Sequence, residues 1–403
     1  MKILMVNRVL YRRSNAENEM FRLGEALQGM GHQVSFFALD DPRNLPLKDA
    51  YVIKHPPMSS GRALRVSLFD RGAREHMLKR IMADRPDLAL VWQVNRTLTY
   101  SVVDALTAAD VPVWVMLTDF TPVCPAQSLA RDGSECRKCL VHRNAWPCFF
   151  HRCDGDRWGK SFAAALESQW MRLKKRWDLP NGYLVPSEYH RLMMERGRFT
   201  HAPIKDVGIP LAEQAFLPQQ TRRGEYLLYV GRLEMRKGIV TLLDALQQCV
   251  AALPLLVVGD GPEMERLRQI VREFGLQNRV NFTGQIGSDP LRRAMAGCLC
   301  LVVPSECEEI APWALLEAQA MGKPAIVSDR SVLPERITSG KNGLVFRHRS
   351  SPELAQCLDA MAEISDEDYQ SMCVCARETA LEQYTPDVFA HRVLKAVGAV
   401  GEE

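Results

Sequence analysis

Short apolar runs alternate with amphipathic helical stretches along this chain, and that alternation most limits its possible folds. In the first half, "KILMVN", "QVSFFAL", "LALVW" and "VPVWVML" have strand character, and residues 17–30 and "YSVVDALTAAD" have helical periodicity. The same order begins again at "YLLYVGRL" and continues through "PLLVVGDG", "RVNFTG" and "LCLVVPS". Strands joined through helices run parallel, with helices on both faces of the sheet. We therefore predict an α/β protein with two Rossmann-like, doubly wound domains.

The segment "GIPLAEQAFLPQQTRRGE" interrupts this pattern, because it has little periodicity and is rich in Pro and Gln. We predict an N-terminal domain over residues 1–207 and a C-terminal domain over residues 208–384. Residues 385–403 are expected to form a C-terminal helix that packs back on the N-terminal domain. Ligands of doubly wound sheets bind beyond the carboxyl ends of the strands, so we expect the ligand in a cleft between the two domains.

Composition excludes several classes of function. The 403 residues are 47% apolar and 25% charged, as in globular proteins. The net charge of +3 gives no electrostatic reason to expect nucleic acid as a partner. No apolar run has the length of a membrane span, and "MKILMVNRVL" has the pattern of a first buried strand, without the features of an export signal. We therefore predict a cytoplasmic protein.

A basic loop follows the first strand of the second half. In "YVGRLEMRKG", Gly231 permits a tight turn, and Arg232 and Lys237 lie between a strand end and a helix start. Two cations in that position form a good phosphate site, although a solvated basic loop has the same composition. Gly259 and Gly261 make a second glycine-rich strand end. The absence of a complete G-x-G-x-x-G argues against a nicotinamide-dependent dehydrogenase.

Two glutamates near "PWALLEAQAMG" stand out from their neighbours. Glu309 precedes this predicted helix, beside its free N–H groups, where a sugar or phosphate can dock. Glu317 lies within a largely apolar helix, so it must bind a ligand or pair with a buried Arg. Glu306 and Glu308 are expected in a loop with no such constraint.

These motifs together resemble those of the retaining family-four glycosyltransferases of GT-B fold. The resemblance rests on motifs that occur in the family's order: "YVGRLEMRKG", "VVGDGP", E-x7-E at Glu309 and Glu317, and "PERITSGKNGLVF". The resemblance covers nearly the whole chain. It implies that Arg232 and Lys237 hold the diphosphate of a nucleotide sugar. It further implies that Glu309 contacts the sugar and Glu317 the ribose, while Glu335 has a structural role.

The resemblance also implies the reaction. A sugar would pass from a nucleotide-diphosphate donor to a hydroxyl of a glycan, a lipid-linked acceptor or a small molecule, with retention of configuration. No D-x-D stands where a metal would be needed, so we expect metal-independent transfer in which the departing phosphate deprotonates the acceptor. Ile310 and Ala311, which follow Glu309, are added to the predicted donor site, together with Gly231, Gly259 and Gly261.

Some positions depart from the family pattern. Ser14 and Asn15 replace two glycines at the turn before the first helix, where Asn tolerates left-handed geometry, and both are assigned to the donor site. Thr118 replaces a His, although the adjacent Asp119 is kept and is assigned to catalysis. Arg330 and Ser331 replace two glycines; Arg330 could contact an acidic donor or acceptor, although an exposed side chain is the favoured expectation. These changes leave two alternatives open: an epimerase- or phosphorylase-type enzyme, or a weakly catalytic binding protein.

Residues 124–153 are dense in cysteine and correspond to a Cys-rich insert found in a subset of the family. Four thiolates at this spacing suit a structural zinc ion, and an iron–sulfur centre uses the same ligands. Free buried thiols are the alternative. The insert is expected to frame the acceptor side. The candidate ligands are Cys124, Cys136, Cys139, Cys148 and Cys153.

The predicted helix near residues 159–180 has clustered cations, Arg172 and residues 174–176, close to Trp170 and Trp177. A basic helix flanked by Trp can rest on anionic lipid at the inner face of a membrane. An ordinary solvated face is the alternative interpretation.

Overall fold

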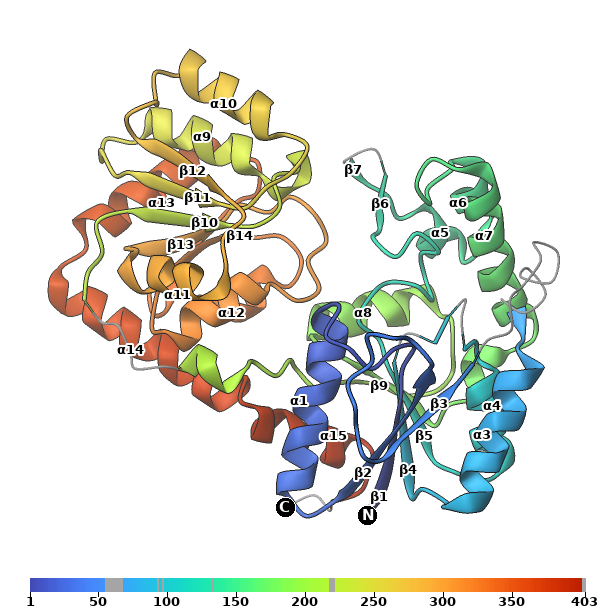
Figure 1. The fold of residues 1–403 in the computed structure, drawn as a ribbon. Coiled ribbons are helices and arrows are strands. Elements are labelled where there is room, and N and C mark those ends of the chain that lie inside the picture. Colours follow the sequence, from blue (N-terminus) through green and yellow to red (C-terminus); the bar gives the residue numbers. More distant parts are fainter. Residues whose placement is uncertain (55–67, 93, 96–97, 132–133, 217–221, 401–403) are drawn as a thin grey trace. The chain divides into compact units, whose positions relative to one another are not determined.

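The chain folds into two compact units (Figure 1). The computed structural model describes residues 1–54, 68–92, 94–95, 98–131, 134–216 and 222–400. Unit 1 contains Met1–Leu129, Cys136–Pro210 and Pro386–Glu403, and unit 2 contains Ala130–Glu135 and Leu211–Thr385. The main division therefore falls between Pro210 and Leu211, three residues after the predicted position. Residues 217–221 of the predicted linker lie outside the described residues.

Unit 1 is built on a seven-stranded parallel sheet of order β3-β2-β1-β4-β5-β8-β9. Its strands are β1 (Lys2–Val6), β2 (Gln33–Leu39), β3 (Ala50–Ile53), β4 (Leu88–Trp92), β5 (Val113–Met116), β8 (Gly182–Val185) and β9 (Ile204–Asp206). Its helices are α1 (Asn15–Gly29), α3 (Arg71–Ala83), α4 (Ser101–Ala108), α5 (Lys138–His142), α6 (Trp146–Phe150), α7 (Trp158–Leu173), η1 (Arg176–Asp178), α8 (Glu188–Gly197) and α15 (Pro386–Ala396).

Unit 2 is built on a six-stranded parallel sheet of order β12-β11-β10-β13-β14-β15. Its strands are β10 (Leu227–Val230), β11 (Leu255–Val258), β12 (Val280–Gly284), β13 (Cys300–Val303), β14 (Ala325–Ser328) and β15 (Gly343–Phe346), with the antiparallel hairpin β6 (Ala130–Arg131) and β7 (Ser134–Glu135). Its helices are η2 (Glu213–Phe216), η3 (Met235–Lys237), α9 (Ile239–Gln248), α10 (Met264–Glu273), α11 (Ser288–Gly297), α12 (Trp313–Ala320), η4 (Leu333–Arg336), α13 (Ser351–Glu363) and α14 (Asp366–Gln383).

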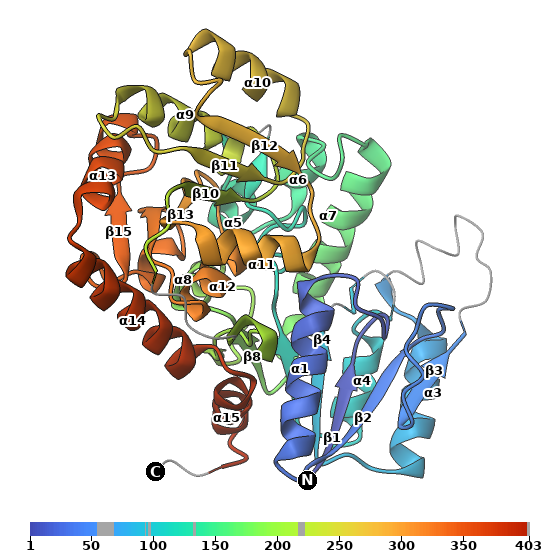
Figure 2. The same ribbon diagram turned by 60° about the vertical axis from the view of Figure 1, so that its left-hand side comes forward.

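The period of two along β10 explains why helices cover both faces of this sheet (Figure 2). Leu227 and Tyr229 pack into the core beneath α9, α10 and α13. Leu228 belongs to the opposite core, with α11 and α12. Successive side chains of a strand point to opposite faces, so a continuous apolar run requires apolar cover on both sides. The prediction of doubly wound α/β domains is thus confirmed.

Local chemistry determines where the first helix begins. Ser14 precedes α1 in extended conformation, and its N–H donates to Glu17 Oε2 at 2.9 Å. This pairing is half of a capping box, which starts the helix at Asn15, two residues before the predicted start. Neither Ser14 nor Asn15 has a positive φ, so the left-handed turn considered for this segment does not occur.

The sheet of unit 2 has one topological switch point. From β10 the chain moves outward through β11 and β12, then returns to place β13 on the other side of β10. The connections after β10 and β13 therefore leave toward opposite faces, and the carboxyl ends of these strands stay uncovered between them. Ligands of doubly wound sheets bind at such a point.

Helix α15, the last in the described chain, packs in the core of unit 1, where it contacts α1. Phe389 is fully buried there among residues of the first strands and α1, whereas Lys395 on the same helix is exposed.

Replacing the buried ring should destabilise unit 1. Phe389→Ala should lower the free energy of unfolding by about 3–5 kcal/mol, because it removes apolar contacts and leaves a cavity. Chemical denaturation monitored by circular dichroism measures the change, with Lys395→Ala as the control on the same helix. Equal stability of the two variants would contradict this packing.

Candidate functional site

The loop after β10 lies directly against the loop after β11. Gly231 N–H donates to the carbonyl oxygen of Val258 at 3.0 Å. Gly259 has φ +138°, and a Cβ there would lie 1.9 Å from Gly231 O. A Cβ on Gly261 would lie 2.3 Å from Leu233 O. Of the three glycines assigned to the donor site, Gly259 and Gly261 are thus required by the close approach of two backbones.

The predicted cations lie in the connection from β10 to α9. Lys237 ends η3, directly before Gly238, which has φ +70° and leaves no room for a side chain beside Pro304. Arg232 is largely exposed, and its Nε lies 2.9 Å from Glu234 Oε1. Arg236 Nε lies 2.6 Å from the other oxygen of Glu234. Sequence reasoning overlooked Glu234, which restrains both arginines.

The central contact joins the loop after β10 to the loop after β13. Lys237 Nζ lies 2.5 Å from Glu309 Oε1, and the hydroxyl of Ser305 donates to the same oxygen at 2.6 Å. The N–H of Glu309 donates to Ser331 Oγ at 2.9 Å. The structure therefore brings together two predicted site residues that are 72 positions apart in the sequence. Only their pairing across the switch point was not predicted.

Both members of this pair are held in their charged forms. Burial raises the pKa of the Glu309 carboxyl, but the Lys237 ammonium and its hydrogen bond outweigh burial, so the pKa lies below the ordinary 4.5. Burial lowers the pKa of Lys237, but the Glu309 charge outweighs it and keeps that pKa above 10.5. At neutral pH the site therefore contains a fixed ammonium and a fixed carboxylate.

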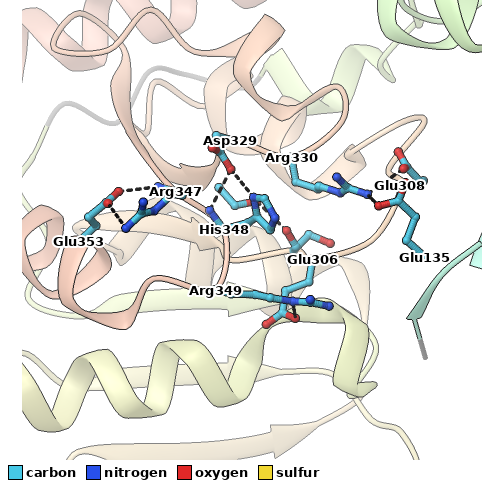
Figure 3. A network of polar contacts seen from close by, with 11 residues as sticks. Glu135, Glu306, Glu308, Asp329, Arg330, Arg347, His348, Arg349 and Glu353 are labelled. Carbon is cyan, nitrogen blue, oxygen red and sulfur yellow. Dashed lines mark hydrogen bonds and ion pairs between the residues drawn. The ribbon is translucent and has the colours of Figure 1, made fainter. Parts of the chain in front are cut away.

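Glu306, expected to lie unconstrained in a loop, is held by contacts with two other side chains (Figure 3). Its Oε1 accepts from Thr241 Oγ1 at 2.9 Å, and Arg349 Nε lies 2.7 Å from its Oε2. Glu306 therefore ties the loop after β13 to α9, which begins beside Lys237. The expectation failed because both partners are distant in sequence.

Glu308 and Arg330 also correct the expectations (Figure 3). The Glu308 side chain is 1% exposed and pairs with Arg330 at 2.9 Å. Arg330 pairs as well with Glu135, on the β6–β7 hairpin that groups with unit 2. Arg330 is therefore not an exposed side chain. A buried carboxylate needs a partner, and Arg330 provides it.

The remaining residues of the predicted donor site surround the start of α12. Glu317 is half-buried on this helix, between the fully buried Leu316 and Ala318. Ile310 and Ala311 are half-buried in the loop before it. Glu335, expected to have a structural role, is exposed on η4.

Three positions predicted for donor binding or catalysis belong to unit 1. Ser14 and Asn15 are exposed at the start of α1, and Asp119 is half-buried after β5, next to the half-buried Thr118. Asp119 Oδ1 accepts from the N–H of Thr121 at 2.8 Å.

A histidine that the sequence did not single out lies behind Asp119. The carbonyl of Asp119 accepts from Nε2 of His190 at 3.1 Å. Burial lowers the pKa of His190 to about 3, so its imidazole is neutral at physiological pH.

The structure does not support the predicted zinc site. Within the described part of the chain, no group of three or more His, Cys, Asp or Glu side chains is placed to hold a metal ion. The five candidate cysteines are free thiols, and Cys124, Cys139 and Cys148 are buried. Burial, together with neighbouring cysteines, raises the pKa of Cys139 to about 12. These three sulfurs pack as small apolar groups.

The ion pair predicts a pH-dependent stability. Glu309→Gln should lower the free energy of unfolding at pH 7 by about 1–3 kcal/mol, because the buried Lys237 ammonium loses its anionic partner and keeps only a neutral amide oxygen as acceptor. The folded-state pKa of Glu309 is below the ordinary 4.5. The stability difference between the native chain and the variant is therefore full above pH 4.5, and it shrinks as the pH falls through the lowered pKa of the folded state. Urea unfolding at several pH values measures it. The exposed control Glu382→Gln should show no such trend, and a constant difference at every pH would argue against the pair.

Sequence comparisons find similarity between part of this chain and glycosyltransferases. Residues 224–363 match the family described as glycosyl transferases group 1. A putative colanic acid biosynthesis glycosyltransferase, WcaL, of Salmonella typhimurium is 26% identical over 203 residues, covering 48% of this chain and 46% of that protein. The GDP-mannose-dependent alpha-(1-6)-phosphatidylinositol monomannoside mannosyltransferase of Mycobacterium tuberculosis is 31% identical over 195 residues, covering 45% of this chain and 50% of that protein. The chain thus spans about half the length of these curated relatives.

A likeness of fold extends over the whole chain. The structure of HepE from Anabaena in complex with UDP has a TM-score of 0.66 and 16% sequence identity, covering 99% of this chain and 100% of that one. Residues 224–363 are thus similar to the glycosyl transferases group 1 family, and the chain has the two-domain GT-B fold seen in glycosyltransferase structures.

Proposed function

We propose that this protein transfers a sugar from a nucleotide-diphosphate sugar to an acceptor hydroxyl. One observation carries the proposal: the Lys237–Glu309 pair lies at the switch point between β10 and β13. A cation and a carboxylate at the carboxyl ends of these strands suit a ligand with a charged diphosphate and a hydroxyl-bearing sugar.

The cations suit the leaving group. When the bond from sugar to phosphate breaks, negative charge develops on the nucleoside diphosphate. The Lys237 ammonium is held in place by Glu309. The Arg232 guanidinium, from the same loop, is accessible to solvent. Fixed positive groups that need no reorganisation stabilise such charge in the transition state. Both residues are therefore proposed to bind the diphosphate.

Two helix starts add to the same electrostatic field. Helix α9 begins after Gly238 and α12 after Pro312, and neither residue caps its helix through a side chain. The first N–H groups of a helix favour anions and polar oxygens. Glu309 lies just before α12, so its carboxylate is proposed to contact hydroxyls of the donor sugar, and Glu317 in α12 to contact the ribose.

Retention of configuration follows from the same arrangement in the proposal. With the diphosphate held on one face of the sugar, its departing oxygen is the base nearest to an acceptor hydroxyl on that face. The acceptor proton passes to this phosphate oxygen while the new glycosidic bond forms. Asp119 is proposed to act on the acceptor side, since it follows β5 in the other unit.

Relatives and neighbours indicate the classes of substrate to test. The Anabaena HepE structures contain UDP or UDP-glucose, and the mycobacterial relative is named for GDP-mannose. Names of the relatives include colanic acid biosynthesis and a phosphatidylinositol mannoside. We propose a glycan or lipid-linked acceptor and a cytoplasmic location, where nucleotide sugars are available.

Loss of either cation should reduce catalysis. Lys237→Ala and Arg232→Ala should each lower kcat/KM for release of nucleoside diphosphate by about 10²-fold or more, as expected when a group that stabilises developing charge is removed. The donor is first identified by thermal shift against UDP-, GDP- and ADP-sugars, since the bound donor stabilises the fold. Arg268→Ala, on the surface of α10, is the matched control and should retain activity. If both site variants kept full activity, or if native protein released no diphosphate from any donor, the proposal would be wrong.

Transfer should not depend on a divalent metal. With Lys237 and Arg232 neutralising the diphosphate, EDTA should leave the rate of nucleoside diphosphate release unchanged within about twofold, because the charge is already compensated. The measurement compares chelated protein with protein supplied with Mg²⁺ or Mn²⁺. A rate that is lost with EDTA and restored by either ion would contradict metal independence.

A further inference from the structure

Exposed aromatic side chains gather at one place on unit 1. Of the Phe and Trp residues that the structure describes, only Phe150, Trp158 and Phe162 are exposed, at 66%, 51% and 38%. With Trp146 and Phe149 they form an aromatic patch over α6 and α7, two helices that pack together (Figure 1). Exposed rings in one cluster are unfavourable in water and indicate an interaction site.

The aromatic patch is preformed. The ring of Phe149 is its centre, with centroid distances of 5.3 Å to Phe150, 5.2 Å to Trp158 and 5.5 Å to Phe162. Beside it is an open, mainly apolar hollow of about 540 Å³. This hollow is lined by His142, Asn144, Trp146, Pro147, Phe149 and Phe150. Because the rings already pack against one another, little side-chain conformational entropy would be lost when the patch is covered.

Positive charge surrounds the rings. Residues 137–162, from α5 to the start of α7, contain six Lys and Arg against two Asp and no Glu, a net charge of +4, whereas the rest of the chain carries −1. Arg152 stacks over the ring of Trp158 at 5.0 Å. Arg157 and Lys160 flank the start of α7, whose first turn has no acidic residue. Cations at a helix N-terminus oppose the helix dipole, so helix stability does not explain their presence.

We propose that the aromatic patch and its basic rim dock the protein on the surface of an anionic lipid bilayer. Aromatic rings favour the boundary between headgroups and acyl chains, and neighbouring Lys and Arg are attracted to anionic headgroups. Among the described residues, no helix is both long and apolar enough to span a membrane. This inference does not depend on the glycosyl transfer proposed above.

The surface differs from the one expected from sequence. Trp177 is 2% exposed and buried, and Arg176 pairs with Asp104. The carboxyl-terminal end of the basic segment therefore offers no pair of exposed Trp rings. The exposed rings lie instead around the start of α7 and on α6. A bilayer is favoured over a protein partner because the net positive charge around the rings complements anionic headgroups, and because the rim includes Lys160, a residue type depleted in protein interfaces.

Vesicle flotation with the full chain tests the proposal. Native protein should float with vesicles of phosphatidylcholine containing about 30% phosphatidylglycerol, with weaker binding to pure phosphatidylcholine and at high salt. Phe150→Ser with Trp158→Ser, and separately Arg157→Glu with Lys160→Glu, should each weaken binding by about tenfold or more. Circular dichroism confirms that each variant is folded.

Matched substitutions on α3 of the same unit serve as controls. Met82→Ser removes an apolar side chain that is 86% exposed, and Lys79→Glu reverses an exposed charge. Both should bind anionic vesicles as the native chain does, and so should Glu309→Gln, which alters only the proposed donor site. Absence of native binding to anionic vesicles would overturn the proposal and leave a protein partner as the occupant. Unchanged binding by both patch variants, or equal binding to neutral vesicles, would also overturn it.

Discussion

The ion pair between Lys237 and Glu309 is the interaction on which the proposed site depends. A doubly wound sheet separates the loops that follow its two central strands, because their connections leave toward opposite faces. The 2.5 Å contact from Nζ to Oε1 spans this separation and holds both loops in register. Each charge also maintains the ionised state of the other against burial. A donor that enters the site therefore meets charges whose positions are already set, which is the condition for electrostatic catalysis.

Three carboxylates near this pair hold the surrounding loops in place and are not proposed to bind the ligand: Glu234, Glu306 and Glu308. Glu234 contacts Arg232 and Arg236, and Glu306 joins Thr241 to Arg349. The Glu234 contacts lie within the loop after β10, whereas the Glu306 contacts connect the loop after β13 to α9 and to the segment after β15. The buried Glu308 shows why such contacts are needed, since its carboxylate would be costly without the Arg330 guanidinium. The acidic stretch after β13 thus organises the loop around Glu309, and its charges are largely compensated within unit 2.

The Cys-rich region of unit 1 is packed by neutral thiols, in contrast to the ion pairs of the site in unit 2. Buried thiols there have raised pKa values, and they fill space as neutral groups. The adjacent helices α6 and α7 place apolar rings outward among cations, which is the reverse of the usual distribution between core and surface. A lipid surface would satisfy both the rings and the charges. If the acceptor is lipid-linked, such docking would bring the protein to its second substrate.

The sequence by itself determined the fold class and the principal candidates, because strand and helix periods, glycines at strand ends and the spacing of Glu309 and Glu317 are local properties. Arg232, Lys237 and Glu309 were all identified in this way. Only the tertiary structure decided which side chains meet: Glu306 with Arg349, Glu308 with Arg330, and the aromatic rings around Phe149. It also buried Trp177, which the sequence placed beside a basic surface. Burial and ion pairing depend on residues far apart in the chain, and no local pattern carries that information.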